Sequence, residues 1–162
     1  MHKRSPEQID ATAEALRSEL AAKIEKYGYT QLVIFPTEDD PDVVKFMYTI
    51  GLTKKGLPEI LVSGNVTNQG AMDMIASVVS ELERNNGQIK LGVRDDLFSV
   101  RVDLRDVTSP VARDEYACQA VTMYGEHVRV LQVVWADLNN VLPNEEGYDS
   151  AKCVQELLPM IH

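Results

Sequence analysis

The sequence predicts an α+β fold in which a mostly antiparallel, mixed sheet of about six strands is flanked by about four helices. Short links join neighbouring apolar strand segments, which is typical of hairpins and not of the long crossovers that parallel strands need. Helical segments with an apolar stripe precede, interrupt and follow these strands. The chain has 162 residues, of which 44% are hydrophobic and 25% charged, so it can bury a sizeable core.

The first element is a helix. Ser5 is a suitable N-cap, and Pro6 follows at the first helical position, where proline is favoured. Apolar residues then recur at steps of three and four until Gly28, which is a common helix stop. We therefore expect a single domain over residues 1–162, made of an N-terminal helix in residues 1–28 and an α+β core in residues 29–162.

Three strands follow the helix. The first is predicted for residues 30–36, and the acidic loop of residues 37–42 separates it from a second strand in residues 43–52. A short Lys/Gly link then leads to a third strand in residues 58–65. The closeness of the second and third strands predicts an antiparallel hairpin.

The second half of the chain alternates helices and strands. Apolar spacing predicts a helix in residues 68–85, two strands in residues 89–93 and 97–107, and a third helix in residues 109–124. Residues 129–137 are apolar on both faces, so this strand is expected at the centre of the sheet.

A terminal helix is predicted to begin at Asp149 or Ser150. Its expected packing residues are Val154, Leu157, Leu158 and Ile161. The two cysteines, Cys118 and Cys153, each fall in a predicted helix and lack the C-x-x-C spacing of metal and redox sites, so a disulfide is not expected.

Charge and hydropathy exclude several classes of function. The formal net charge is −9 at pH 7 and the pI is about 4.8, which argues against direct binding to nucleic acid or to an anionic membrane. The sequence shows neither a signal peptide nor an apolar run long enough to span a bilayer, so a cytoplasmic location is expected.

The residue types needed for common catalysis are scarce. Two of the three histidines, His2 and His162, lie at the chain ends, which leaves His127 alone. A histidine/cysteine zinc site, a nucleophile elbow and the standard phosphate-binding loops are all absent from the sequence. We therefore expect no metal, no cofactor and no identifiable catalytic residue.

Polar residues near strand ends form the candidate ligand-binding site. They are Tyr48, Thr49, Glu59, Asn65, Arg101, Arg105, Gln132, Asp137 and Tyr148. Most of them also have a structural interpretation. Glu59 is a candidate partner for Lys54 or Lys55, Gln132 for the backbone of a neighbouring strand, and Asp137 is a candidate cap for the turn that follows it.

The order of these motifs resembles the domain of unknown function 4262 family, which comprises small bacterial and bacteriophage proteins. The resemblance covers residues 27–158. The motifs are Tyr48-Thr49-Ile50-Gly51-Leu52, Pro58-Glu59, Gln132-Val133-Val134-Trp135-Ala136-Asp137, Gly147-Tyr148 and Gln155. Leu57 stands where members often have histidine before the Pro-Glu pair, and Ala136 where they often have proline. The resemblance implies a compact α/β or α+β domain and a phage or mobile-element context, but no activity.

Three hypotheses for the function follow. The first is a non-catalytic protein that binds or sequesters a small molecule, for example a nucleotide, with Arg101 and Arg105 as anion contacts. The second is an inhibitor or adaptor that binds a host protein through its acidic surface. The third is a hydrolase or transferase that uses Glu59 with Asp137 or His127. Whether the first helix packs on the sheet or on another subunit of a homo-oligomer is open.

Overall fold

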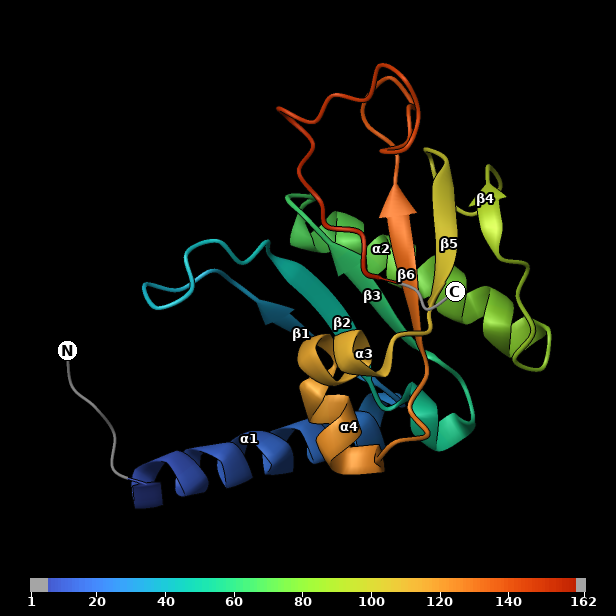
Figure 1. Ribbon diagram of the computed structural model, residues 1–162. Helices are drawn as coiled ribbons and strands as arrows, with labels where there is room; N and C mark the ends of the chain where they lie inside the picture. The colour runs from blue at the N-terminus through green and yellow to red at the C-terminus, as the bar shows by residue number, and fades with distance from the viewer. Residues whose placement is uncertain (1–5, 160–162) are drawn as a thin grey trace.

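The computed structural model describes residues 6–159 and consists of a twisted sheet with helices on both faces (Figure 1). Its helices are α1 (Pro6–Tyr27), the 3-10 helix η1 (Leu52–Lys55), α2 (Asn68–Arg84), α3 (Pro110–Tyr116) and α4 (Cys118–Tyr124). Its strands are β1 (Thr30–Ile34), β2 (Phe46–Ile50), β3 (Glu59–Ser63), β4 (Gly92–Arg94), β5 (Val102–Val107) and β6 (Val130–Trp135).

The six strands form one mixed sheet in the order β1-β2-β3-β6-β5-β4. All neighbours are antiparallel except β3 and β6, which run parallel. The predicted α+β class is therefore confirmed, as is the hairpin of β2 and β3. The prediction of a central strand is also confirmed, because β6 lies between β3 and β5 and all six of its residues are buried.

Each face of the sheet has its own apolar cluster. α2 covers one face, where Met74, Ile75 and Val78 pack against strand residues such as Ile60 and Val133. The other face, which we call the α1/α4 face, is covered by α1, α3 and α4 (Figure 1). Leu20 and Ile24 of α1 are buried in the second cluster, so the C-terminal half of this helix packs on the sheet of its own chain.

The turn between β2 and β3 explains one glycine of the Tyr48–Leu52 motif. Gly51 has φ +120°, a region that side chains rarely adopt. A Cβ at this position would lie 3.0 Å from the carbonyl oxygen of Gly28, so the end of α1 lies close against the turn. η1 then follows directly and leads into β3.

The predicted helix of residues 109–124 is wrong as a single element, because the chain breaks at Ala117. This residue has φ −96° and ψ 39°, and its N–H closes α3 by bonding the carbonyl of Arg113. Ala112 of α3, Ala117 at the break and Ala120 of α4 are all buried in the cluster on the α1/α4 face.

The predicted terminal helix is also wrong. Residues 136–159 contain no helix or strand. Val154 and Leu157 are partly exposed, and only Leu158 is fully buried; Ile161 lies outside the described residues. Cys153 is accordingly not helical, and both cysteines are free. In residues 154–158 the backbone bonds to the side chains of Ser63, Asn65 and Gln132 instead of forming helical hydrogen bonds.

The described part of the chain contains no helix with the length and hydrophobicity that crossing a membrane requires. The strand predicted for residues 89–93 overlaps β4 at Gly92 and Val93, and the strand predicted for residues 97–107 is present but shorter, as β5.

We predict that Ile60→Ala lowers the free energy of unfolding by about 2–5 kcal/mol, because Ile60 is fully buried between the sheet and α2 and its removal leaves a cavity. Val111→Ala is the matched control, since this side chain is 75% exposed and should change stability by less than about 0.5 kcal/mol. Urea denaturation followed by circular dichroism measures both. An equal loss of unfolding free energy in Ile60→Ala and Val111→Ala would contradict the assignment of Ile60 to the core.

Candidate functional site

Several predicted site residues lie on one face of the sheet. The register places Tyr48, Leu61, Gln132 and Arg105 opposite one another across β2, β3, β6 and β5. Glu59 lies two residues before Leu61 and so belongs to the same, α1/α4 face. Tyr48, Glu59 and Gln132 therefore share a face, but each has no exposed surface. What they contact decides what they can do.

Glu59 is a buried carboxylate with four donors. Its Oε1 accepts from the Thr49 hydroxyl at 2.8 Å and the Leu52 amide at 3.2 Å. Its Oε2 accepts from the Thr53 amide at 2.8 Å and from the Thr53 hydroxyl. The predicted pairing with Lys54 or Lys55 is wrong, because Glu59 points inward and binds the first amides of η1, which have no partner within that helix.

Opposing effects act on the ionisation of Glu59. Burial raises the pKa of its carboxyl above the ordinary value, and the hydrogen bonds from Thr53, Thr49 and Leu52 lower it in part. Thr49 is satisfied as well, because its hydroxyl also accepts from the Ile60 amide at 2.9 Å. The carboxylate thus has no oxygen directed at an open space, and its role in this structure is to join the β2–β3 turn to the sheet.

Tyr48 lies beside this group. Its hydroxyl oxygen accepts from the amide of Gln119 at 3.2 Å, at the start of α4. Burial raises the pKa of the Tyr48 phenol well above its ordinary value, and the hydrogen bond from Gln119 opposes that shift. Tyr48 is therefore a neutral phenol that connects β2 to α4.

Gln132 and Asn65 bind the end of the chain. We call residues 152–158 the C-terminal strap. Gln132 donates from Nε2 to the carbonyl of Glu156 at 2.6 Å and accepts on Oε1 from the amide of Leu158 at 2.9 Å. The backbone of a neighbouring strand was the predicted partner of this amide, and this prediction is wrong: the partner is the strap.

Asn65 and Tyr148 contact the first part of the strap. Asn65 donates from Nδ2 to the carbonyl of Lys152 at 2.7 Å and accepts on Oδ1 from the amide of Val154 at 3.0 Å. The Tyr148 hydroxyl donates to the carbonyl of Cys153 at 2.6 Å. These predicted site residues bind a segment of their own chain.

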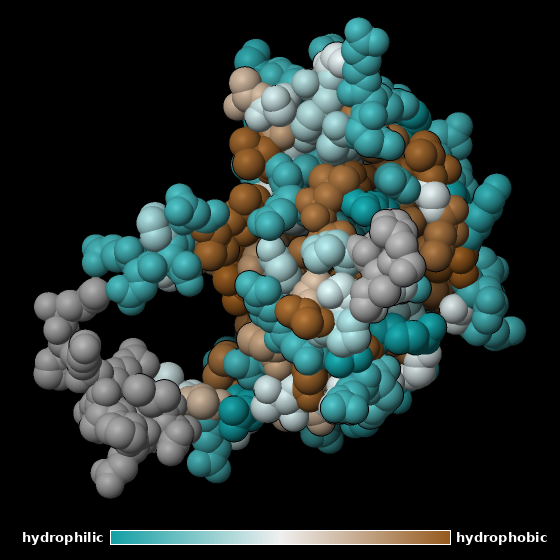
Figure 2. Space-filling model, in the orientation of Figure 1, coloured by the Kyte–Doolittle hydropathy of each residue, from teal (hydrophilic) through white to brown (hydrophobic). Residues whose placement is uncertain are grey.

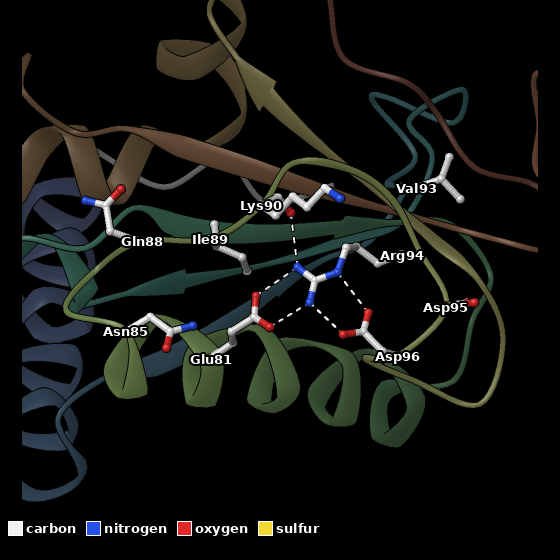
Figure 3. Close-up of a pocket in the computed structure, with 9 residues that line it drawn as sticks. All are labelled: Glu81, Asn85, Gln88, Ile89, Lys90, Val93, Arg94, Asp95 and Asp96. Atoms are coloured by element: carbon white, nitrogen blue, oxygen red, sulfur yellow. Dashed lines mark hydrogen bonds and ion pairs between the residues drawn. The ribbon is translucent and has the colours of Figure 1, made fainter.

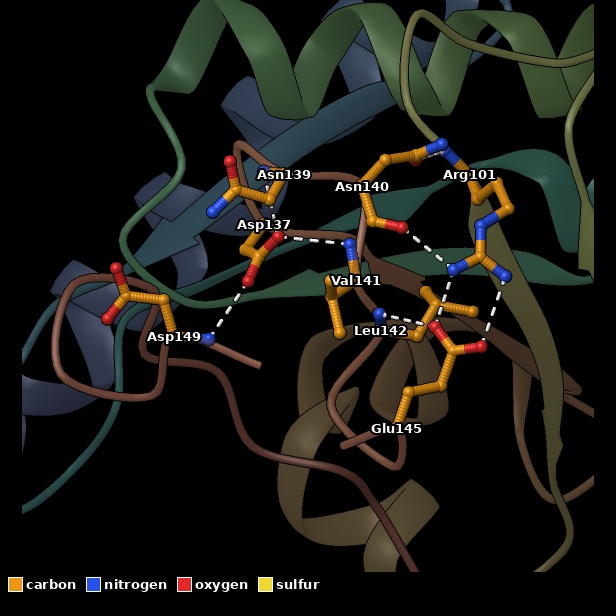
Figure 4. A network of polar contacts seen from close by, with 8 residues as sticks. All are labelled: Arg101, Asp137, Asn139, Asn140, Val141, Leu142, Glu145 and Asp149. Atoms are coloured by element: carbon orange, nitrogen blue, oxygen red, sulfur yellow. Dashed lines mark hydrogen bonds and ion pairs between the residues drawn. The ribbon is translucent and has the colours of Figure 1, made fainter. Parts of the chain in front are cut away.

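Asp137 and Arg101 organise the loop that leads to the strap (Figure 4). Asp137 accepts from the amides of Asn139, Val141 and Asp149, at 2.9, 3.0 and 2.9 Å. The predicted turn-capping role of Asp137 is confirmed, and these hydrogen bonds lower the pKa of its carboxyl. Arg101 forms an ion pair with Glu145 and donates to the carbonyl of Asn140 at 2.7 Å.

Arg105 differs from the other predicted residues. Its Nη1 atom is buried and has no hydrogen-bond partner within the described part of the chain. A buried guanidinium nitrogen without an acceptor is costly, so it is a candidate contact for an acceptor group on a ligand.

A hydrophilic cluster lies between α2 and β4, beside an open cavity of about 720 Å³ (Figure 3). Arg94 at its centre donates to both carboxylate oxygens of Glu81, at 2.6 and 2.9 Å, and to both of Asp96, at 2.8 Å each. The Arg94 hydrogen bonds lower the pKa of both carboxyls. The cluster is closed on itself and attaches the edge strand β4 to α2.

Sequence reasoning missed a second cavity, of about 390 Å³, which we call the acidic cavity. It is lined by Ile34, Asp40, Asp42, Val43, Phe46, Glu115, Tyr116 and Glu156. Figure 2 shows the hydrophilic loop between β1 and β2 projecting to one side, with hydrophobic residues at its base. The loop was visible in the sequence as an acidic run, but the other carboxylates come from α3 and from the strap, and only the fold places them beside it.

Two rings form the apolar wall of the acidic cavity. The centroids of Phe46 and Tyr116 lie 5.0 Å apart, with their planes tilted by 59°. Burial, followed by the charge of Glu156, raises the pKa of Tyr116 to about 12. The cavity therefore combines aromatic surface with four carboxylates. The described residues contain no group of three or more histidine, cysteine or acidic side chains arranged to hold a metal ion.

Residues 23–149 match the family described as Domain of unknown function (DUF4262). The chain belongs to this family. Neither the curated proteins nor the solved structures compared with the chain give a match. The DUF4262 region contains all of the predicted site residues, whereas the C-terminal strap and most of α1 lie beyond it.

We predict that Glu59→Gln lowers the free energy of unfolding at pH 7.4 by about 1–3 kcal/mol, because one oxygen that now accepts becomes an NH₂ group facing other donors. Glu83→Gln is the control, since the Glu83 side chain is half exposed in its ion pair with Lys55. Urea denaturation measures both, and a Glu59→Gln protein as stable as the parent would contradict the assigned contacts.

The pH dependence of this difference has a defined sign. Because the pKa of Glu59 is raised in the folded state, that state binds the proton more tightly than the unfolded chain does. The resulting stability is fully present below the unfolded pKa of about 4.3 and is lost as pH rises through the folded pKa. The advantage of the parent over Glu59→Gln should therefore shrink as pH rises from about 4.

Proposed function

We propose that this DUF4262 protein is a non-catalytic small-molecule binding protein whose ligand carries a positive charge beside an apolar group. The observation that carries the proposal is the acidic cavity. Its volume of about 390 Å³ falls in the range of small-molecule sites. Bacteriophage origin and a cytoplasmic location are part of the same proposal and rest on the sequence resemblance and composition.

The charge of the cavity selects the ligand. Asp40 and Asp42 come from the β1–β2 loop, Glu115 from α3 and Glu156 from the strap, and the described residues that line the cavity include no lysine or arginine. Four carboxylates around one space favour a cation and repel a phosphate. The Tyr116 and Phe46 rings supply an aromatic wall on which the apolar part of an amine or guanidinium compound packs.

The contacts of the acidic residues favour binding over catalysis. Glu59 and Asp137, the carboxylates considered for a hydrolase or transferase, are both occupied by hydrogen bonds from backbone amides. A general acid or base needs a free path to the substrate proton. The carboxylates of the acidic cavity line an open site, but no nucleophile accompanies them among its lining residues.

We predict that arylalkyl amines and guanidinium compounds bind the parent protein, and that the double variant Asp40→Asn, Asp42→Asn weakens binding at least about tenfold through loss of charge. Isothermal titration calorimetry at low salt measures the affinity of each protein for these compounds. The control is Asp39→Asn, in the same loop but not part of the cavity lining.

Neutral alcohols of the same shape form the ligand control. If no cation gives heat of binding, the proposal is overturned. Equal affinity in the double variant (Asp40→Asn with Asp42→Asn) and in the control Asp39→Asn would overturn it as well. The alternative is that the same surface binds a small protein with a basic segment. A pull-down with the parent, the double variant and the Asp39→Asn control distinguishes a protein partner from a small-molecule ligand.

A nucleotide-type ligand is the second candidate, because Arg105 offers a buried guanidinium nitrogen without an acceptor. Arg101, the other proposed anion contact, is paired with Glu145. We predict that any heat seen with a panel of mono-, di- and cyclic nucleotides is lost in Arg105→Gln and kept in Arg101→Gln. No heat with any nucleotide, or equal heat in both variants, would exclude this candidate.

A further inference from the structure

The C-terminal strap lies on the protein as an extended peptide lies in a binding groove. It crosses the ends of β3 and β6 without helix or strand of its own (Figure 1). Its backbone bonds to the side chains of Ser63, Asn65 and Gln132 are made on alternate residues: Lys152, Val154, Glu156 and Leu158. The backbone of Cys153 bonds instead to Asp149 and Tyr148 in the preceding loop. We call the surface formed by Ser63, Gly64, Asn65, Gln132 and Trp135 the strap groove.

The two amide side chains bind the strap in the same way. Asn65 bonds the carbonyl of Lys152 and the amide of Val154, and Gln132 bonds the carbonyl of Glu156 and the amide of Leu158. In each case the bonded carbonyl and amide are two residues apart, which is the spacing a parallel neighbouring strand uses. Each side-chain amide therefore takes the place of a strand residue and recognises the backbone of an extended chain.

Ser63 and Asn65 complete this recognition. The Ser63 hydroxyl accepts from the amide of Glu156 at 2.9 Å, and the Asn65 amide donates to the carbonyl of Val154 at 3.0 Å. Gly64 lies between them with φ +112°, and a Cβ there would lie 2.2 Å from the Val154 carbonyl oxygen. Only glycine permits so close an approach of the two backbones.

Two strap side chains provide selectivity. Gln155 donates from Nε2 to the carbonyl of Trp135 at 2.7 Å and to the Tyr148 hydroxyl at 2.9 Å, and it accepts from the Trp135 amide at 3.2 Å. Leu158 is buried in the apolar cluster of the α1/α4 face. A residue that makes three hydrogen bonds and a buried leucine three positions later form a distinct pattern for recognition.

We infer that the strap groove is a peptide-binding site that is occupied here by the chain's own C-terminal residues. The partner that fits it is an extended peptide with glutamine at one position and leucine three positions later. Such a peptide binds when the strap leaves. The groove residues lie within residues 23–149, which the DUF4262 model matches, and the strap follows that region in the chain.

The first test is hydrogen exchange of the protein of residues 1–162, read by NMR at the amides of Val154, Glu156 and Leu158 and at the β6 amide of Val133. A detachable strap opens without unfolding the sheet, so its amides should exchange at least about a hundredfold faster than Val133. Asn65→Ala should increase strap exchange by about a further tenfold and leave Val133 unchanged. The control Gln69→Ala removes an exposed amide that bonds Asp73.

Strap amides that exchange at the same rate as Val133 would overturn the inference, because the strap would then leave only on global unfolding. An equal effect of Asn65→Ala and Gln69→Ala would overturn it as well.

The second test supplies the peptide in trans. A protease site is inserted between Ser150 and Ala151, both exposed, and the purified protein is cut so that the strap remains bound without a covalent link. A fluorescent peptide of residues 151–162 should then replace it with saturable binding, and unlabelled peptides with Gln155→Ala or Leu158→Ala should compete at least about tenfold more weakly. Unfolding on cutting, no uptake of peptide, or equal competition would overturn the inference.

Discussion

The parallel pairing of β3 with β6 is the contact on which the rest of the structure depends. It joins Glu59 to Val130 and Leu61 to Gln132, residues separated by about 70 positions in the sequence. The pairing inserts β6 between two antiparallel pairs, β2–β3 and β5–β4. Through it the α1/α4 face gains Gln132, and the end of β6 comes to lie beside Ser63, whose carbonyl accepts from the Trp135 indole at 2.8 Å. The strap groove exists only because these two strands are neighbours.

Satisfaction of buried polar groups accounts for the composition of this face. A hydroxyl, an amide or a carboxylate removed from water must find partners within the protein. Glu59 finds them in the β2–β3 turn, and Gln132 finds them in the strap. The polar residues that stand out in the sequence therefore connect separate segments to the sheet. The same requirement leaves the Arg105 Nη1 atom as an exception within the described residues.

The local pattern of the sequence predicts much of the fold but little of the site. Alternation and apolar spacing were sufficient for β2, β3, α2 and the central position of β6, because each buries a continuous face. The same reasoning failed for the strap. Val154, Leu157 and Leu158 have helical spacing, but tertiary hydrogen bonds from Asn65 and Gln132 outweigh that local preference. The acidic cavity was hidden for a related reason, since its carboxylates come from three segments far apart in the chain.

Glu156 connects the two proposed sites. Its backbone is bonded by Ser63 and Gln132 in the strap groove, and its side chain lines the acidic cavity beside Tyr116. A cation in that cavity is attracted to the Glu156 carboxylate only while the strap is seated, so cation binding stabilises the seated strap. By linkage, a displacing peptide without an acidic residue at the position of Glu156 leaves three carboxylates in the cavity and lowers its affinity for the cation by the same factor. Such a peptide and a cationic ligand therefore compete although they occupy different surfaces, whereas a peptide with the sequence of the strap restores the fourth carboxylate.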